Sequence, residues 1–228
     1  MEKLNKVSTP VVAYNNGGAN DFNFLCSLTN ATYLKVEQIQ ANNFGGELPK
    51  CIVNFSTTLT ILSLHNNKIY GNIPLGIGNL INLETLEMWN SKLSSNIPSK
   101  IRKLRRLQYL ALSQNNFFGN ITFSLGNLTL LISLYLDDNN LQGSISLSLG
   151  KCQNMIDLNL ANNNLSDTIS YQVFSLSFSL IFLDLSANKF IGVLPIEVGN
   201  FVNLQELKIT ENMMFGKILG SIGSCVKL

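Results

Sequence analysis

The chain has 228 residues, of which 46% are hydrophobic and 13% are charged, and its formal net charge is +2. The charge is too weak and too scattered for the basic face that binds nucleic acid. No run of 18 apolar residues is present to form a transmembrane helix, and the first residues are too polar for a signal-peptide core. We therefore expect no nucleic-acid partner and no direct membrane insertion by this chain.

A pattern of about 24 residues recurs along most of the sequence. It has the form Leu-x-x-Leu-x-Leu-x-x-Asn-x-Leu-x-Gly-x-Ile-Pro, and a clear copy begins at Leu59 and continues through Asn67, Gly71 and Pro74. Self-similarity at this period predicts a leucine-rich-repeat solenoid, in which each unit packs only against its neighbours.

The repeats divide the chain into two parts. Residues 1–33 form a divergent repeat that opens at Val7 and contains the insert 17–22. Residues 34–228 hold eight copies, which begin at Leu34, Leu59, Leu83, Leu107, Leu131, Met155, Leu180 and Leu204. We expect neither end to carry a cap.

The order of residue types within a copy predicts its local structure. The alternation in Leu-x-x-Leu-x-Leu predicts a short strand with leucines inward, and the apolar pair after the proline predicts a 3₁₀ or short helical turn. We therefore expect an α/β repeat fold: a right-handed superhelix with a concave parallel sheet and convex turns. The recurring asparagine, from Asn15 in the first copy to Asn212 in the last, predicts a ladder of amide hydrogen bonds between repeats.

Three departures from the pattern stand out. Ser91 replaces the ladder asparagine, Asp167 replaces the repeat glycine, and Glu37 replaces a core leucine. Burying the Glu37 carboxylate among leucines would cost several kcal/mol of folding free energy unless the side chain turns outward or finds a partner.

The four cysteines show no metal or redox spacing. Cys152 and Cys225 occupy an apolar repeat position, which predicts inward-facing free thiols. Cys26 and Cys51 lie in neighbouring repeats and could pair, but spacing alone leaves this open. We expect no metal and no cofactor.

The Leu-x-Gly-x-Ile-Pro half of the pattern, with the phrases 18–30, 54–58, 79–86 and 194–200, resembles the ectodomains of plant leucine-rich-repeat receptor-like serine/threonine kinases. The resemblance is to the subclass of the flagellin and elongation-factor immune receptors. It implies binding of a peptide or protein ligand, a co-receptor kinase as a further partner, and a location on the extracellular side of the plasma membrane. The paired-cysteine caps, membrane helix and kinase motifs of these receptors are missing, so we expect a partial receptor that is not an enzyme.

In that family the ligand contacts come from outward residues of the concave strands. The same columns in this chain bring together aromatic and charged residues over four adjacent repeats, a composition typical of binding hot spots. The candidate ligand-binding residues are His65, Glu87, Trp89, Tyr109, Tyr135, Asp137 and Asp138. A parallel sheet also tolerates aromatic residues on any face, so a structural role is the alternative. No catalytic residue is predicted.

Two further features concern the surface. Five Asn-x-Ser/Thr sequons predict glycosylation in an exported protein, although the repeat consensus itself generates some of them. They are Asn30, Asn54, Asn120, Asn127 and Asn164. The basic run from Lys100 to Arg106 is interpreted as a solvated convex face.

The leading functional hypothesis is therefore a ligand-perceiving receptor segment in defence or development signalling. The alternatives are a freestanding secreted repeat protein similar to inhibitors of cell-wall-degrading enzymes, and a non-functional truncated receptor fragment.

Overall fold

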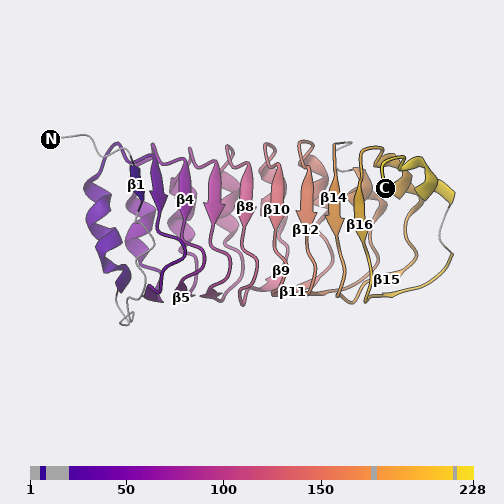
Figure 1. Cartoon of the computed structure of the whole chain (residues 1–228), viewed down its shortest axis with the longest axis horizontal. Coiled ribbons are helices and arrows are strands. Elements are labelled where there is room, and N and C mark those ends of the chain that lie inside the picture. Colours follow the sequence, from indigo (N-terminus) through magenta and orange to yellow (C-terminus); the bar gives the residue numbers. More distant parts are fainter. Residues whose placement is uncertain (1–5, 9–20, 176–178, 218–219) are drawn as a thin grey trace.

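The computed structural model describes residues 6–8, 21–175, 179–217 and 220–228. One strand from each repeat enters a parallel nine-stranded sheet, in which each strand lies beside that of the preceding repeat (Figure 1). The strands are β1 (Lys6–Ser8), β2 (Val36–Gln38), β4 (Ile61–Ser63), β6 (Thr85–Glu87), β8 (Tyr109–Ala111), β10 (Ser133–Tyr135), β12 (Asp157–Asn159), β14 (Phe182–Asp184) and β16 (Glu206–Lys208).

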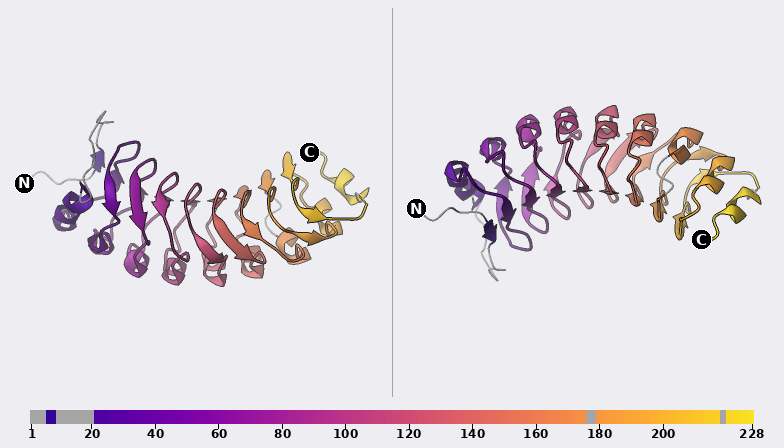
Figure 2. Two further views of the ribbon diagram at one scale, coloured as in Figure 1. Left: turned by 90° about the horizontal axis from the view of Figure 1, so that it is seen from below. Right: turned by 90° about the horizontal axis from the view of Figure 1, so that it is seen from above.

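The other side of each repeat carries a 3₁₀ helix. These helices are η1 (Asp21–Asn30), η2 (Lys50–Asn54), η3 (Leu75–Asn79), η4 (Ser99–Lys103), η5 (Phe123–Asn127), η6 (Leu147–Lys151), η7 (Tyr171–Ser175), η8 (Ile196–Asn200) and η9 (Gly220–Ser224). Figure 2 shows the chain as an arc, with the strands along its inner side and the helical turns along its outer side. The predicted leucine-rich-repeat solenoid is confirmed.

Short strands also form along the edge that leads from the inner to the outer side. They are β3 (Gly45–Glu47), β5 (Lys68–Gly71), β7 (Lys92–Leu93), β9 (Phe118–Asn120), β11 (Asn140–Gly143), β13 (Asn164–Leu165), β15 (Ile191–Gly192) and β17 (Met213–Met214). The repeat glycine lies here in the left-handed region, with a φ of +85° at Gly71. Asp167 takes the same conformation with a φ of +67°, which an L side chain adopts only at a cost.

The core consists of the predicted leucine columns. Leu62, Leu86 and Leu110 lie side by side in register and are completely buried. Cys152 and Cys225 are free and buried, as predicted. Each repeat buries its apolar side chains only against its neighbours, so the core is continuous along the solenoid.

Glu37 lies inside this core. It pairs in register with Leu62 and has no exposed surface. Neither carboxylate oxygen has a hydrogen-bond partner among the described residues. Burial raises the pKa of the Glu37 carboxyl to about 8, so the side chain is mostly protonated at neutral pH.

The asparagine ladder forms as predicted at Asn67, Asn115, Asn139, Asn163, Asn188 and Asn212. Asn115 donates from Nδ2 to the carbonyl oxygen of Met88 at 2.9 Å, and its Oδ1 accepts from the Leu93 amide at 3.0 Å. These bonds tie the copy that begins at Leu107 to the copy before it. Ser91 cannot replace them, because its buried Oγ has no hydrogen-bond partner among the described residues. Asn15 lies outside the described residues.

The start of the chain differs from the expectation in register. β1 pairs Val7 with Glu37, which places Val7 at the fourth position of its repeat and not at the first. Residues 17–20 of the insert lie outside the described part, and η1 follows them directly. A disulfide between Cys26 and Cys51 joins η1 to η2, so the pairing that the sequence left open is present.

Candidate functional site

The seven candidate residues lie on the inner side of the arc, on β6, β8 and β10 or in the turns that follow the strands. We call them the concave patch: His65, Glu87, Trp89, Tyr109, Tyr135, Asp137 and Asp138. All seven are half-buried, so each is supported by neighbours and still reaches solvent. They line adjacent repeats because parallel strands in register present equivalent positions side by side.

Contacts between neighbouring repeats fix the first part of the patch. The rings of His65 and Trp89 stack, with centroids 4.1 Å apart and planes 12° from parallel. Ser63 Oγ donates to Glu87 Oε2 at 2.7 Å. Burial lowers the pKa of His65, an effect that nearby Glu87 opposes. His65 is therefore an aromatic platform at neutral pH rather than a cation.

The second part of the patch combines two tyrosines with a carboxylate. The rings of Tyr109 and Tyr135 are 5.6 Å apart. Ser113 Oγ donates to Asp137 at 2.6 Å, while burial raises the pKa of the Asp137 carboxyl despite this bond. Asp138 turns away into the tight turn after the strand, where its φ is +53° and Asn162 donates to its carboxylate.

A hollow of about 220 Å³ opens between these side chains. Its lining residues are Trp89, Tyr109, Ala111, Ser113, Gln114, Tyr135, Asp137 and Asn159. The structure therefore brings four candidates together around one hollow, with His65 and Glu87 beside it. Asp138 is in the adjoining turn and does not line it.

Two contributors were not predicted. Ala111 is almost fully buried and lies in register between Glu87 and Tyr135, so its small side chain leaves the space that forms the hollow. Asp157 on β12 accepts a hydrogen bond from Ser133 Oγ at 2.9 Å and lies close enough to Tyr135 to raise the pKa of its phenol. In the sequence, Ala111 is a small residue at the repeat position that Glu87 and Tyr135 hold in the adjacent copies. Asp157 is a further acid at an outward position of a strand.

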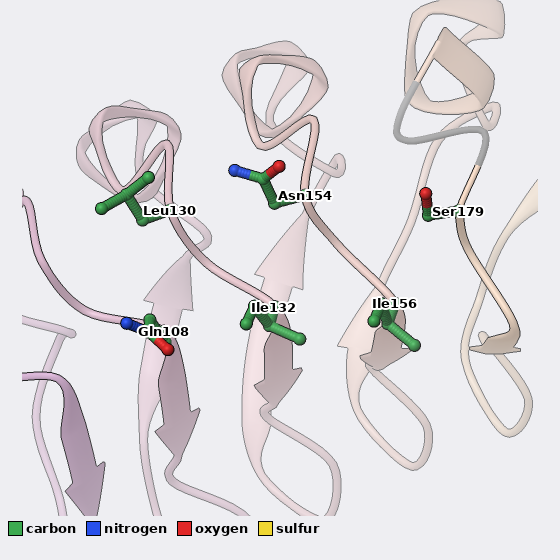
Figure 3. Close-up of a pocket in the computed structure, with 6 residues that line it drawn as sticks. All are labelled: Gln108, Leu130, Ile132, Asn154, Ile156 and Ser179. Atoms are coloured by element: carbon green, nitrogen blue, oxygen red, sulfur yellow. The ribbon is translucent and has the colours of Figure 1, made fainter.

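A second groove lies on the edge of the arc where the outer turns lead into the strands. It has a volume of about 450 Å³ and is lined by Gln108, Leu130, Ile132, Asn154, Ile156 and Ser179. Figure 3 shows Ile132 and Ile156 at the ends of neighbouring strands, with Leu130 and Asn154 on the segments above them. This groove is mainly apolar and contains neither an aromatic nor a charged residue, so it offers less specificity than the concave patch.

The five sequons lie away from the nine-stranded sheet. Asn30, Asn54 and Asn127 end the helices η1, η2 and η5, while Asn120 and Asn164 lie in the edge strands β9 and β13. All are exposed except Asn127, which is half-buried. The basic run follows its prediction, since Ile101 and Leu104 are fully buried beneath the solvated outer turn.

The repeats match those of known proteins. The Leucine Rich Repeat family profile matches residues 58–80, 130–152 and 179–201. The receptor kinase-like protein Xa21 of Oryza sativa subsp. japonica is 47% identical over 66 residues, which cover 29% of this chain and 6% of that protein. The chain folds as a leucine-rich-repeat solenoid, and its repeats are similar to those of plant receptor kinases.

Solved structures of receptor ectodomains share its shape. The plant peptide hormone receptor RGFR1 in complex with RGF2 superposes with a TM-score of 0.86 at 28% identity, over 89% of this chain and 32% of that one. The Arabidopsis receptor kinase HAESA, in complex with the peptide hormone IDA and the co-receptor SERK1, gives a TM-score of 0.72 at 31% identity, over 88% of this chain and 37% of that one. The solenoid spans about a third of these ectodomains and a much smaller share of Xa21. None of its described helices has the length and hydropathy needed to cross a membrane.

Proposed function

We propose that this chain is a peptide- or protein-binding segment of a plant receptor-like kinase ectodomain, which perceives a ligand in defence or development signalling. The observation that carries the proposal is the concave patch, in which half-exposed aromatic and charged side chains from three adjacent repeats surround one hollow and His65 of a fourth repeat stacks beside it. Aromatic anchors beside charged groups are the usual composition of binding hot spots.

The proposal is supported by the complexes of the similar ectodomains. RGFR1 and HAESA are described with peptide hormones, and HAESA also with a co-receptor kinase. A ligand and a co-receptor kinase are therefore the partners that we propose here. The chain would contribute recognition, and phosphoryl transfer would belong to another part of the receptor.

An extracellular location is part of the same proposal. The Cys26–Cys51 disulfide is a bond of oxidising compartments and is rare in the cytosol. We also propose glycosylation at the exposed sequons Asn30, Asn54, Asn120 and Asn164, and lower occupancy at half-buried Asn127. Peptide mapping of the chain secreted from plant cells, before and after enzymatic deglycosylation, would measure each site. Unmodified asparagines throughout would contradict this part of the proposal.

The binding function can be tested with a random 12-residue peptide library displayed on phage. Peptides selected on the chain should change the fluorescence of Trp89, which is the single tryptophan of the sequence. The variants Tyr135→Ala and Asp137→Ala should weaken the selected peptides at least tenfold, because both side chains line the hollow.

The matched control is Tyr171→Ala, since Tyr171 is a largely exposed tyrosine on the outer turn η7. It should leave binding unchanged. Peptides that bind equally well to the two hollow variants, but lose affinity for the Tyr171 variant, would refute the concave patch as the binding surface.

A further inference from the structure

Charge is distributed unevenly between the two sides of the arc. The outward positions of β2 to β16, with the two residues after each strand, carry the carboxylates Glu87, Asp137, Asp157, Asp184 and Glu206. Lys208 is the one lysine or arginine at these described positions. The outer turns η2 to η8 instead carry mainly bases, which are Lys50, Lys100, Arg102, Lys103 and Lys151, with Glu197 as an acid on η8. The inner side is therefore acidic although the whole chain is weakly positive, and it would attract a basic ligand.

The chain itself shows how a cation fits this surface. Lys208 Nζ lies 5.2 Å from the centre of the Phe182 ring, 2.6 Å from Glu206 Oε1 and 3.9 Å from Asp184 Oδ2. An aromatic face and two carboxylates from neighbouring strands thus hold one ammonium group. This combination of cation–π attraction and ion pairing is favourable for both lysine and arginine side chains.

The hollow offers the same groups without an internal cation. Trp89, Tyr109 and Tyr135 line it together with Asp137, and Asp157 lies beside Tyr135. The two ion pairs found among the described residues are both made by Lys208, so these carboxylates have no basic partner there.

Burial and, to a smaller extent, the nearby carboxylates raise the pKa values of the tyrosines of the hollow. Burial raises the pKa of Tyr109, and Glu87, Asp157 and Asp137 raise it further. Burial and Asp157 also raise the pKa of Tyr135 to about 12. The carboxylates therefore direct a negative potential into the hollow, where a cation would be stabilised.

We propose that the hollow binds the guanidinium group of an arginine on the bound peptide. This rests on the proposed function and adds the chemical class of the ligand. A planar guanidinium can stack on the aromatic rings while its N–H groups donate to Asp137, which the compact ammonium of lysine cannot do as well. The volume of about 220 Å³ is below the range of small-molecule pockets and suits one side chain.

A pair of small probes tests this without a known ligand. N-acetyl-arginine amide carries the guanidinium, and N-acetyl-citrulline amide is its uncharged analogue of the same shape. Trp89 fluorescence would follow the titration of both probes into the full chain. We expect the arginine probe to bind at least tenfold more tightly than the citrulline probe, and to weaken as ionic strength rises. Equal affinities, or affinities that do not depend on salt, would overturn the proposal.

Three variants locate the binding. Asp137→Asn keeps the shape of the side chain and removes its charge, so it should weaken the arginine probe at least fivefold and the citrulline probe much less. Ala111→Leu fills the hollow and should weaken both probes. Glu197→Gln, on the outer turn η8, removes one charge elsewhere and is the matched control. If the Asp137 and Glu197 variants weaken the arginine probe equally, the effect of charge is long-range and does not come from contact in the hollow. That result would overturn the proposal.

The outcomes also separate this proposal from the function on which it rests. Library peptides that depend on Tyr135 but contain no enrichment of arginine would overturn the arginine assignment while the binding function stands. Library peptides that ignore the concave patch would refute the binding function, whatever the small probes do.

Discussion

Replacing Glu37 by leucine should stabilise the protein in a pH-dependent way. Glu37 occupies a fully buried core position that other repeats fill with leucine, and its carboxylate has no hydrogen-bond partner among the described residues. The substitution Glu37→Leu would restore the repeat pattern and remove the titrating group.

The magnitude follows from the pKa shift. The Glu37 carboxyl has an ordinary pKa of 4.5 and a folded-state pKa of about 8. The folded state binds this proton more tightly than the unfolded state does. Its binding therefore adds to the free energy of unfolding in full below pH 4.5. This contribution decreases as the pH rises from 4.5 to about 8 and is then fully lost. At about 1.36 kcal/mol per pH unit, the loss over this window is about 5 kcal/mol.

The assay compares urea unfolding of wild type and Glu37→Leu at pH 4.5, 6, 7 and 9. Circular dichroism would report the whole solenoid, and hydrogen exchange of the β2 amides would report the repeat around Glu37. We expect the advantage of the leucine variant to grow by about 5 kcal/mol between the lowest and the highest pH.

The free energy of unfolding is plotted against pH for wild type and for Glu37→Leu. The difference between the two curves cancels the titration of the groups that both proteins share. Glu197→Leu on the outer turn η8 is the control, and its difference from wild type should not follow this pH window. A difference in the free energy of unfolding between Glu37→Leu and wild type that stays constant from pH 4.5 to 9 would refute the reasoning. Glu37 would then have the same pKa in the folded and the unfolded chain.

Other expectations concern single positions. Ser91→Asn should raise the free energy of unfolding by about 1–2 kcal/mol by adding the missing amide hydrogen bonds, and an unchanged urea midpoint would contradict this. Asp167→Gly should add about 1 kcal/mol, because its φ of +67° suits glycine, and a destabilised variant would show that the carboxylate has another role. Reduction of Cys26–Cys51 should cost about 3.5 kcal/mol for a loop of 25 residues, measured by unfolding with and without reductant. Buried Cys152, with a pKa raised to about 11, should resist a thiol reagent at pH 8 until the chain unfolds; rapid labelling of the native protein would argue against a closed core.

Most of the fold follows from the sequence because one pattern is repeated. The leucine columns, the inner sheet and the outer 3₁₀ turns all follow from residue spacing, and a copy without proline keeps the backbone of the others. Thr122 and Ser146 precede their helices with nearly the same φ and ψ as Pro74. Neighbouring repeats impose this conformation, so single substitutions rarely change it.

The repeat pattern does not predict how particular side chains contact one another or how the first strand pairs. The pattern places Tyr109, Ala111 and Asp137 on one surface, but it does not say that the small side chain of Ala111 leaves a hollow there. The first repeat was misplaced for a related reason. Without a clear leucine pattern, register depends on strand pairing, and β1 pairs three residues away from the expected alignment.

The gap in the asparagine ladder has a consequence for how this molecule would respond to force or to a partner. Ser91 leaves the repeats of β4 and β6 without the amide bridge that joins other pairs, so surface side chains add to the strand pairing and the buried core that hold them together. Those side chains include His65 on Trp89 and Ser63 on Glu87, which belong to or adjoin the concave patch. If the concave patch binds a ligand as proposed, a molecule that contacts both His65 and Trp89 would also strengthen the junction between their repeats.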